Sequence, residues 1–175
     1  MGKWTRRVFI TAGGLVGGGL ALGVAGIAFA PNRFGLVPQA DGDRSWLTVW
    51  LKLTPDNFAT VVVPHCEMGQ GTHTGLAQLV AEELECDWRK VIVEPVTPGQ
   101  NLARKRVWGE MSTGGSRGIR ISQDYVRRGG AAARMMLMQA AADDWKVPVT
   151  EVTVSDGIIT HAASARSTSY GKVAA

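Results

Sequence analysis

The stretch that decides the fold runs Phe58-Ala59-Thr60-Val61-Val62-Val63-Pro64-His65-Cys66-Glu67-Met68-Gly69-Gln70-Gly71-Thr72-His73-Thr74. Its first six residues favour a strand, and apolar residues recur after it at helical spacing, at Leu76, Leu79, Val80 and Leu84. Glycines let backbone N–H groups approach a ligand closely, and the start of a helix leaves several N–H donors unpaired. This order therefore predicts a cradle for an anionic group, in which the Gln70 amide donates and accepts towards a flat heterocycle. The alternative is an ordinary tight turn.

Another glycine-rich turn, Ser112-Thr113-Gly114-Gly115-Ser116-Arg117-Gly118, precedes a long helical pattern from about Gln123 to Trp145. A serine hydroxyl and an arginine guanidinium are groups that bind phosphate. The two turns can thus hold two parts of one large anionic ligand. Neither turn is a Walker A loop, because no Gly-Lys-Ser/Thr follows, and the first is not the dinucleotide fingerprint.

Composition limits the classes of function. The 175 residues suffice for one domain or one and a half. Residues 1–30 carry three basic groups and no acid, so the other 16 basic and 15 acidic groups leave only +1 of the net charge of +4 to residues 31–175. We therefore expect no nucleic-acid partner. Cys66 and Cys86 make neither a disulfide framework nor a metal spacing, and no metal ligands are predicted.

The N-terminus reads as an export signal. Thr5-Arg6-Arg7-Val8-Phe9-Ile10 matches a twin-arginine signal, and Ala28-Phe29-Ala30 has the form of a cleavage site. The segment from Val8 to Ala30 is also long enough to span a bilayer if it is retained. We expect residues 1–30 to be a twin-arginine signal or anchor, and the protein to be periplasmic, either free or membrane-associated. The alternative is a chance arginine pair before an ordinary membrane helix.

The remaining patterns suggest the fold class. Residues 31–45 read as a linker, and residues 97–110 as an irregular basic loop. Strands are expected at 46–53, 58–63 and 90–96, with a hairpin at 151–161 around an Asp-Gly turn and a helix beginning near Tyr170. We predict an α/β (α+β) fold, a two-layer mixed sheet with helices on one face, preceded by the signal or anchor helix.

Four motifs stand in register: Glu67-Met68-Gly69-Gln70-Gly71-x-His73-Thr74, Ala81-Glu82-Glu83-Leu84, Val91-x-Val93 and Thr113-Gly114-Gly115-Ser116-Arg117. Together they resemble the molybdopterin-binding subunit of the xanthine oxidase family. With the leader and the early Met-Gly-Gln-Gly motif, the chain is most similar to the isoquinoline 1-oxidoreductase beta-subunit and membrane-associated aldehyde dehydrogenase branch. The resemblance covers Trp46 to the end and makes residues 46–175 a partial molybdopterin-binding domain.

The resemblance implies roles for particular residues. Met68, Gly69 and Gln70, with Gly71 of the same motif, match the segment that contacts the pterin and the molybdenum environment. Gly115, Ser116 and Arg117 match the turn that holds the phosphate or the cytosine dinucleotide extension of molybdopterin. The family hydroxylates a small-molecule substrate, an aldehyde or N-heterocycle, with water as the oxygen source. Electrons leave through [2Fe–2S] clusters on a small iron–sulfur partner subunit, and in this branch we expect them to reach a membrane cytochrome c.

No catalytic residue is assigned, because the family's base is a glutamate in a distant C-terminal segment that has no counterpart here. Glu67 belongs to the cofactor motif and is not taken as that base. The chain looks like the N-terminal portion of a larger polypeptide and is expected to be inactive alone. The alternatives are a non-catalytic exported binding module, or truncated remnant, and a serine hydrolase. For the last, Gly114-x-Ser116-x-Gly118 satisfies the nucleophile-elbow pattern, although no buried strand leads into it.

Overall fold

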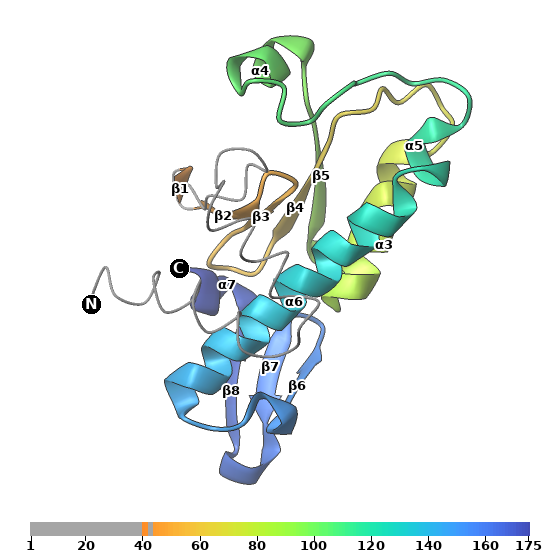
Figure 1. Ribbon diagram of the computed structural model, residues 1–175. Helices are drawn as coiled ribbons and strands as arrows, with labels where there is room; N and C mark the ends of the chain where they lie inside the picture. The colour runs from red at the N-terminus through yellow and green to blue at the C-terminus, as the bar shows by residue number, and fades with distance from the viewer. Residues whose placement is uncertain (1–39, 42–43) are drawn as a thin grey trace, which may run out of the picture.

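A five-stranded mixed sheet lies at the centre of the computed structural model, which describes residues 40–41 and 44–175 (Figure 1). Its strands follow one another in space as they do in the chain: β1 (Ala40–Asp41), β2 (Arg44–Thr48), β3 (Leu51–Leu53), β4 (Ala59–Val63) and β5 (Val91–Pro95). The pairs from β1 to β4 are antiparallel, whereas β4 and β5 are parallel. The predicted export signal lies outside the described residues. Within the described residues, no helix is both long and apolar enough to cross a membrane.

The strand expected over residues 46–53 is in fact two strands, so that prediction was wrong. Thr48 pairs with Leu51, and the chain reverses at Val49 and Trp50, where the Trp50 N–H donates to the Thr48 hydroxyl at 3.1 Å. A local side-chain bond of this kind favours a turn over a continued strand. The apolar run signals burial but does not show where the chain turns. β1 and the start of β2 also fall within the segment expected to be a linker, residues 31–45.

Two long helices cover one face of the sheet, as predicted. They are α3 (Thr72–Leu84) and α6 (Gln123–Trp145). Leu76, Val80 and Leu84 are buried in one apolar cluster with residues of β3 and β4. The helices approach closely, because a Cβ on Gly130 of α6 would lie 2.8 Å from the Val80 carbonyl oxygen. Small residues on α6 therefore make the packing of the two helices possible.

The opposite face of β4 is covered by the segment expected to be an irregular loop. Residues 97–110 contain α4 (Pro98–Ala103), in which Thr97 and Gln100 form a capping box and proline takes the first helical position. Trp108 follows, is 6% exposed and packs against Val62, while its indole N–H donates to the Val49 carbonyl at 3.0 Å. The cap residues were the signal for this helix in the sequence.

A second sheet follows α6. It consists of β6 (Val152–Ser155), β7 (Ile158–His161) and β8 (Arg166–Ser169), all antiparallel, and precedes α7 (Tyr170–Ala174). The Asp-Gly hairpin and the final helix were predicted, but β8 was not. The shorter elements are α5 (Arg117–Arg120), η1 (Trp88–Lys90), η2 (Val149–Glu151) and η3 (Ala162–Ser164). Asn57 joins the two sheets: its amide donates to the Gly157 carbonyl at 3.2 Å and accepts from the Gly171 N–H at 3.0 Å.

Candidate functional site

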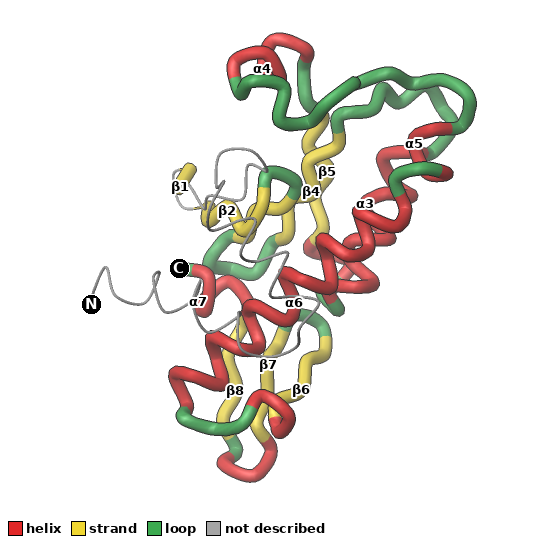
Figure 2. Tube along the Cα trace, viewed as in Figure 1, coloured by secondary structure: helices red, strands yellow, loops and turns green. Residues whose placement is uncertain are grey.

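The two glycine-rich turns lie against each other, although Cys66 of the first and Thr113 of the second are 47 residues apart in the chain. The first turn (Cys66–Gly71) connects β4 to α3, and the second turn (Ser112–Arg117) leads into α5; Figure 2 shows both loops at the same end of the molecule. The Cys66 N–H donates to the Thr113 hydroxyl at 2.9 Å. A Cβ on Gly118 would come within 2.7 Å of the Thr72 side chain. The fold therefore brings the two groups of predicted site residues into one region.

The N–H donors of the first turn are already bonded to a side chain of the protein. One carboxylate oxygen of Glu67 accepts from the N–H groups of Gly69, at 2.8 Å, and Gly71, at 3.0 Å. The other accepts from the His73 N–H at 3.0 Å. The bond from His73 and then that from Gly71 hold the pKa of this exposed glutamate below its usual value. Donors that the spacing assigns to a ligand anion are thus paired with Glu67, whose role in the turn the sequence analysis missed.

Gln70 closes the same turn. Its side-chain oxygen accepts from the Met68 N–H at 2.6 Å, and its side-chain nitrogen donates to the Cys66 carbonyl at 2.7 Å. Gly69 and Gly71 have φ angles of +93° and +76°, which favour glycine. The Met68 side chain is 68% exposed. The first turn therefore presents an apolar side chain to solvent, while its polar groups bond to one another.

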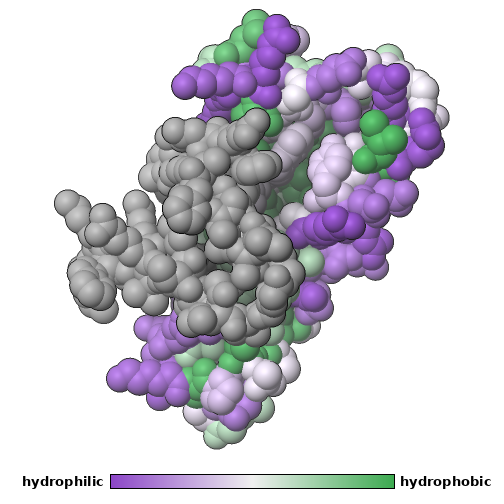
Figure 3. Space-filling model, viewed as in Figure 1, coloured by the Kyte–Doolittle hydropathy of each residue, from purple (hydrophilic) through white to green (hydrophobic). Residues whose placement is uncertain are grey.

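The second turn is more open. The Arg117 guanidinium is exposed and, within the described residues, makes no hydrogen bond or ion pair. The turn is closed by the Arg117 N–H, which donates to the Gly114 carbonyl at 3.1 Å. Hydrophilic side chains surround a small apolar patch over α5, where Ile119 and Ile121 are exposed (Figure 3). An unpaired guanidinium beside exposed glycines fits a phosphate group. The first turn can bind a phosphate group only if the Glu67 carboxylate moves away from the N–H groups to which it is bonded.

The serine-hydrolase alternative finds little support in the described part of the chain. Ser116 makes no hydrogen bond there to a histidine or a carboxylate, and the residues that precede it do not form a strand. The geometry of a nucleophile elbow is therefore not present. No group of three or more histidine, cysteine, aspartate or glutamate side chains within residues 40–41 and 44–175 could hold a metal ion.

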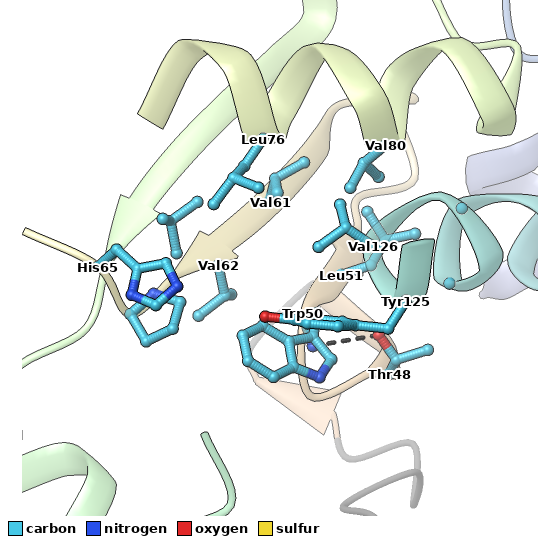
Figure 4. A pocket seen from close by; sticks show the side chains of 14 residues that line it. Thr48, Trp50, Leu51, Val61, Val62, His65, Leu76, Val80, Tyr125 and Val126 are labelled. Atoms are coloured by element: carbon cyan, nitrogen blue, oxygen red, sulfur yellow. Dashed lines mark hydrogen bonds between the residues drawn. The ribbon is translucent and has the colours of Figure 1, made fainter. Parts of the chain in front are cut away.

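An apolar pocket of about 240 Å³ lies next to the first turn, between the end of β4 and the start of α6 (Figure 4). Trp50 and Tyr125 line it, with ring centroids 6.0 Å apart. His65 also lines it and is 8% exposed; burial, and then the nearby His73, lower its pKa. Neither turn's glycines line this pocket. It can take an apolar group beside a neutral imidazole, but it is not the anion cradle that the spacing predicts.

The comparisons with known proteins agree on one family. The family model described as "Molybdopterin cofactor-binding domain" matches residues 10–175. The isoquinoline 1-oxidoreductase subunit beta of Brevundimonas diminuta is 35% identical over 161 residues, which cover 86% of this chain and 21% of that protein. The membrane-bound aldehyde dehydrogenase [pyrroloquinoline-quinone] of Gluconacetobacter polyoxogenes is 31% identical over 172 residues, which cover 98% of this chain and 21% of that protein.

Among solved structures, the quinoline 2-oxidoreductase of Pseudomonas putida 86 has a similar fold. The TM-score is 0.54 at 20% sequence identity, over 71% of this chain and 15% of that chain. At that identity the likeness concerns the fold alone. The chain spans about a fifth of the length of the two curated relatives, at 21% of each.

Proposed function

The chain belongs to the molybdopterin cofactor-binding domain family, and from that premise we propose that it is the cofactor-binding part of a molybdenum hydroxylase. The observation that carries the proposal is the contact between the two turns, in which the Cys66 N–H lies 2.9 Å from the Thr113 hydroxyl. A ligand longer than either turn can therefore touch both. The activity, substrates and partners of the whole protein are proposals, since this chain spans only part of its relatives.

Each turn has its own part in holding the cofactor. Arg117, with Gly115 and Ser116, binds the phosphate end of molybdopterin in its cytosine dinucleotide form. The residues of the first turn, Met68 to Gly71, contact the remainder of the group. The bound group supplies oxidation of the substrate with water as the oxygen source. The residues of this chain bind and orient it.

The printed names of the relatives support the finer parts of the proposal. Isoquinoline is an N-heterocycle and the other relative is named for an aldehyde, so the proposed substrate is one of these two classes. The word "subunit" in the first name supports a partner. We assign to that partner, a small iron–sulfur subunit, the [2Fe–2S] clusters that take the electrons, and to a membrane cytochrome c the next step. The leader supports export to the periplasm by the twin-arginine route.

The first prediction tests Arg117. In the full assembly, Arg117→Ala removes a charge-assisted phosphate contact, and we expect about a tenfold loss of bound molybdenum and cytosine nucleotide. Metal analysis and nucleotide chromatography of the isolated protein measure both. Arg128→Ala is the matched control, since Arg128 is an exposed arginine of α6 outside both turns. Because one relative is named for pyrroloquinoline quinone, the same extract is assayed for that quinone. An active assembly that contains no molybdenum would refute the proposal.

A further inference from the structure

We propose that Glu67 is a built-in anion that closes the first turn to phosphate and so directs the anionic end of the ligand to the second turn. The identity of that ligand rests on the proposed function. The contacts of Glu67 do not, because they lie entirely within this chain. Glu67 is thus a positioning residue: it shapes the turn without touching reacting atoms.

The three bonds to Glu67 are the ones a bound anion would make. The N–H groups of Gly69, Gly71 and His73 converge on one carboxylate at 2.8 to 3.0 Å. Backbone N–H groups that converge in this way form an anion-binding concavity, and their bonds to a carboxylate are charge-assisted. The first turn of α3 itself contains no acidic residue. Glu67 therefore supplies the negative charge that the start of this helix favours.

A free phosphate competes poorly for the same donors. Glu67 lies only four residues before Gly71, and a tethered group acts at an effective concentration of about millimolar or more. A phosphate that approached without displacing Glu67 would meet a like charge at close range, which is unfavourable. The first turn therefore repels an anion while the carboxylate stays in place.

This arrangement favours one orientation of a ligand that contacts both turns. Beside the carboxylate, the first turn exposes Met68, whose side chain suits an uncharged group. The second turn exposes the Arg117 guanidinium, which suits an anion. Because Thr113 links the two turns directly, a ligand held by both has its orientation set by the opposite charges of Glu67 and Arg117.

Amide hydrogen exchange with chemical rescue tests the role of Glu67. In the full chain, Glu67→Ala should raise exchange on the order of tenfold in peptides spanning residues 66–74, because three N–H groups lose their acceptor. Excess acetate or inorganic phosphate should slow it again by entering the vacated site, and neither should slow exchange in the wild type. Unchanged exchange in Glu67→Ala would overturn the inference. So would phosphate or acetate that protects the wild-type turn equally well.

Two further variants guard against misreading a general loss of structure. Glu82→Gln changes an exposed glutamate of α3, the helix that follows the first turn, and should leave exchange at residues 66–74 unaltered. Should Glu67→Ala not fold, Glu67→Gln, which keeps the side-chain length but not the charge, carries the test. In Glu67→Gln the rate of amide exchange must rise at residues 66–74 but not in α6. A rise of equal size in Glu82→Gln would count against a specific role for Glu67.

The molybdenum and nucleotide content of the assembly separates this inference from the proposed function. A wild-type assembly without either component refutes the proposed function and leaves the exchange result standing. A loaded wild type whose first turn exchanges at the same rate with and without Glu67 refutes the inference alone.

Discussion

The first and second turns share a glycine-rich composition, and a helix follows each of them, yet their charged side chains differ in how they are bonded. In the first turn, Glu67 takes three backbone donors and Gln70 bonds to two backbone groups of its own loop. In the second, the Arg117 guanidinium has no partner within the described residues. Glycine spacing therefore predicts where backbone N–H donors converge, but not whether those donors are free to bind a ligand. An acidic residue within a few positions can fill them.

The largest effect is expected for Gly118→Ala, which tests whether the starts of α3 and α5 pack against each other beside the two turns. A Cβ on Gly118 would lie 2.7 Å from the Thr72 side chain. Gly118→Ala should therefore cost about 2 kcal/mol of stability by overpacking and push the turns apart. Denaturant unfolding of the full chain measures the cost. Thr72→Ala in the same chain removes both atoms nearest to the new Cβ and should restore most of the loss. If the double variant is no more stable than Gly118→Ala, the starts of α3 and α5 do not pack against each other at this point.

A pair of glycine substitutions sharpens the contrast between the turns. Gly71 has a φ of +76°, so Gly71→Ala should cost about 1 to 1.5 kcal/mol through backbone strain, although no atom lies within 4 Å of the new Cβ. Gly114 has no atom within 4 Å either and does not have a positive φ, so Gly114→Ala should change stability little. If Gly71→Ala and Gly114→Ala lower the free energy of unfolding equally, the expected difference between the turns is wrong. Unfolding of each full chain under the same conditions makes the comparison.

The smallest expected effect concerns the hydroxyl that joins the turns. Thr113→Val keeps the side-chain shape but leaves the Cys66 N–H without its acceptor at 2.9 Å. We expect a loss of about 0.5 to 1 kcal/mol and faster amide exchange at Cys66. Thr113→Ser keeps the hydroxyl and should behave as the wild type in both measurements. If Thr113→Val and Thr113→Ser give the same amide exchange rate at Cys66, the bond between Cys66 and Thr113 does not hold the turns together.

Much of the fold could be predicted because its signals are local. The apolar spacing of Leu76, Val80 and Leu84 predicts α3, and the Asp-Gly pair at residues 156–157 predicts the second hairpin. The reversal at Val49 and Trp50 was missed because a continuous apolar run does not show where the chain turns. β8 was missed because Arg166–Ser169 contains no apolar residue to mark a strand.

The candidate site was predicted less fully than the fold. Its residues could be selected from glycine, serine and arginine spacing, and the fold does bring the two turns together. Which of their groups remain available to a ligand depends on competition among acceptors in three dimensions. The Glu67 carboxylate wins that competition in the first turn, and no spacing rule predicts it, since the outcome depends on the φ angles of Gly69 and Gly71.

The side-chain amide of Asn57 bonds to residues that are synthesised at least 100 residues later. Its bond to the Gly171 N–H closes a segment of 114 residues, and its bond to Gly157 closes one of 100. Contacts between residues so distant in sequence form late, because closing a long loop costs entropy before it gains contacts. The turn between β3 and β4 thus acquires its last support only after α7 has left the ribosome. A nascent chain that has produced both glycine-rich loops still lacks α7, and with it the Gly171 N–H that bonds to Asn57 at the start of the strand leading into the first loop.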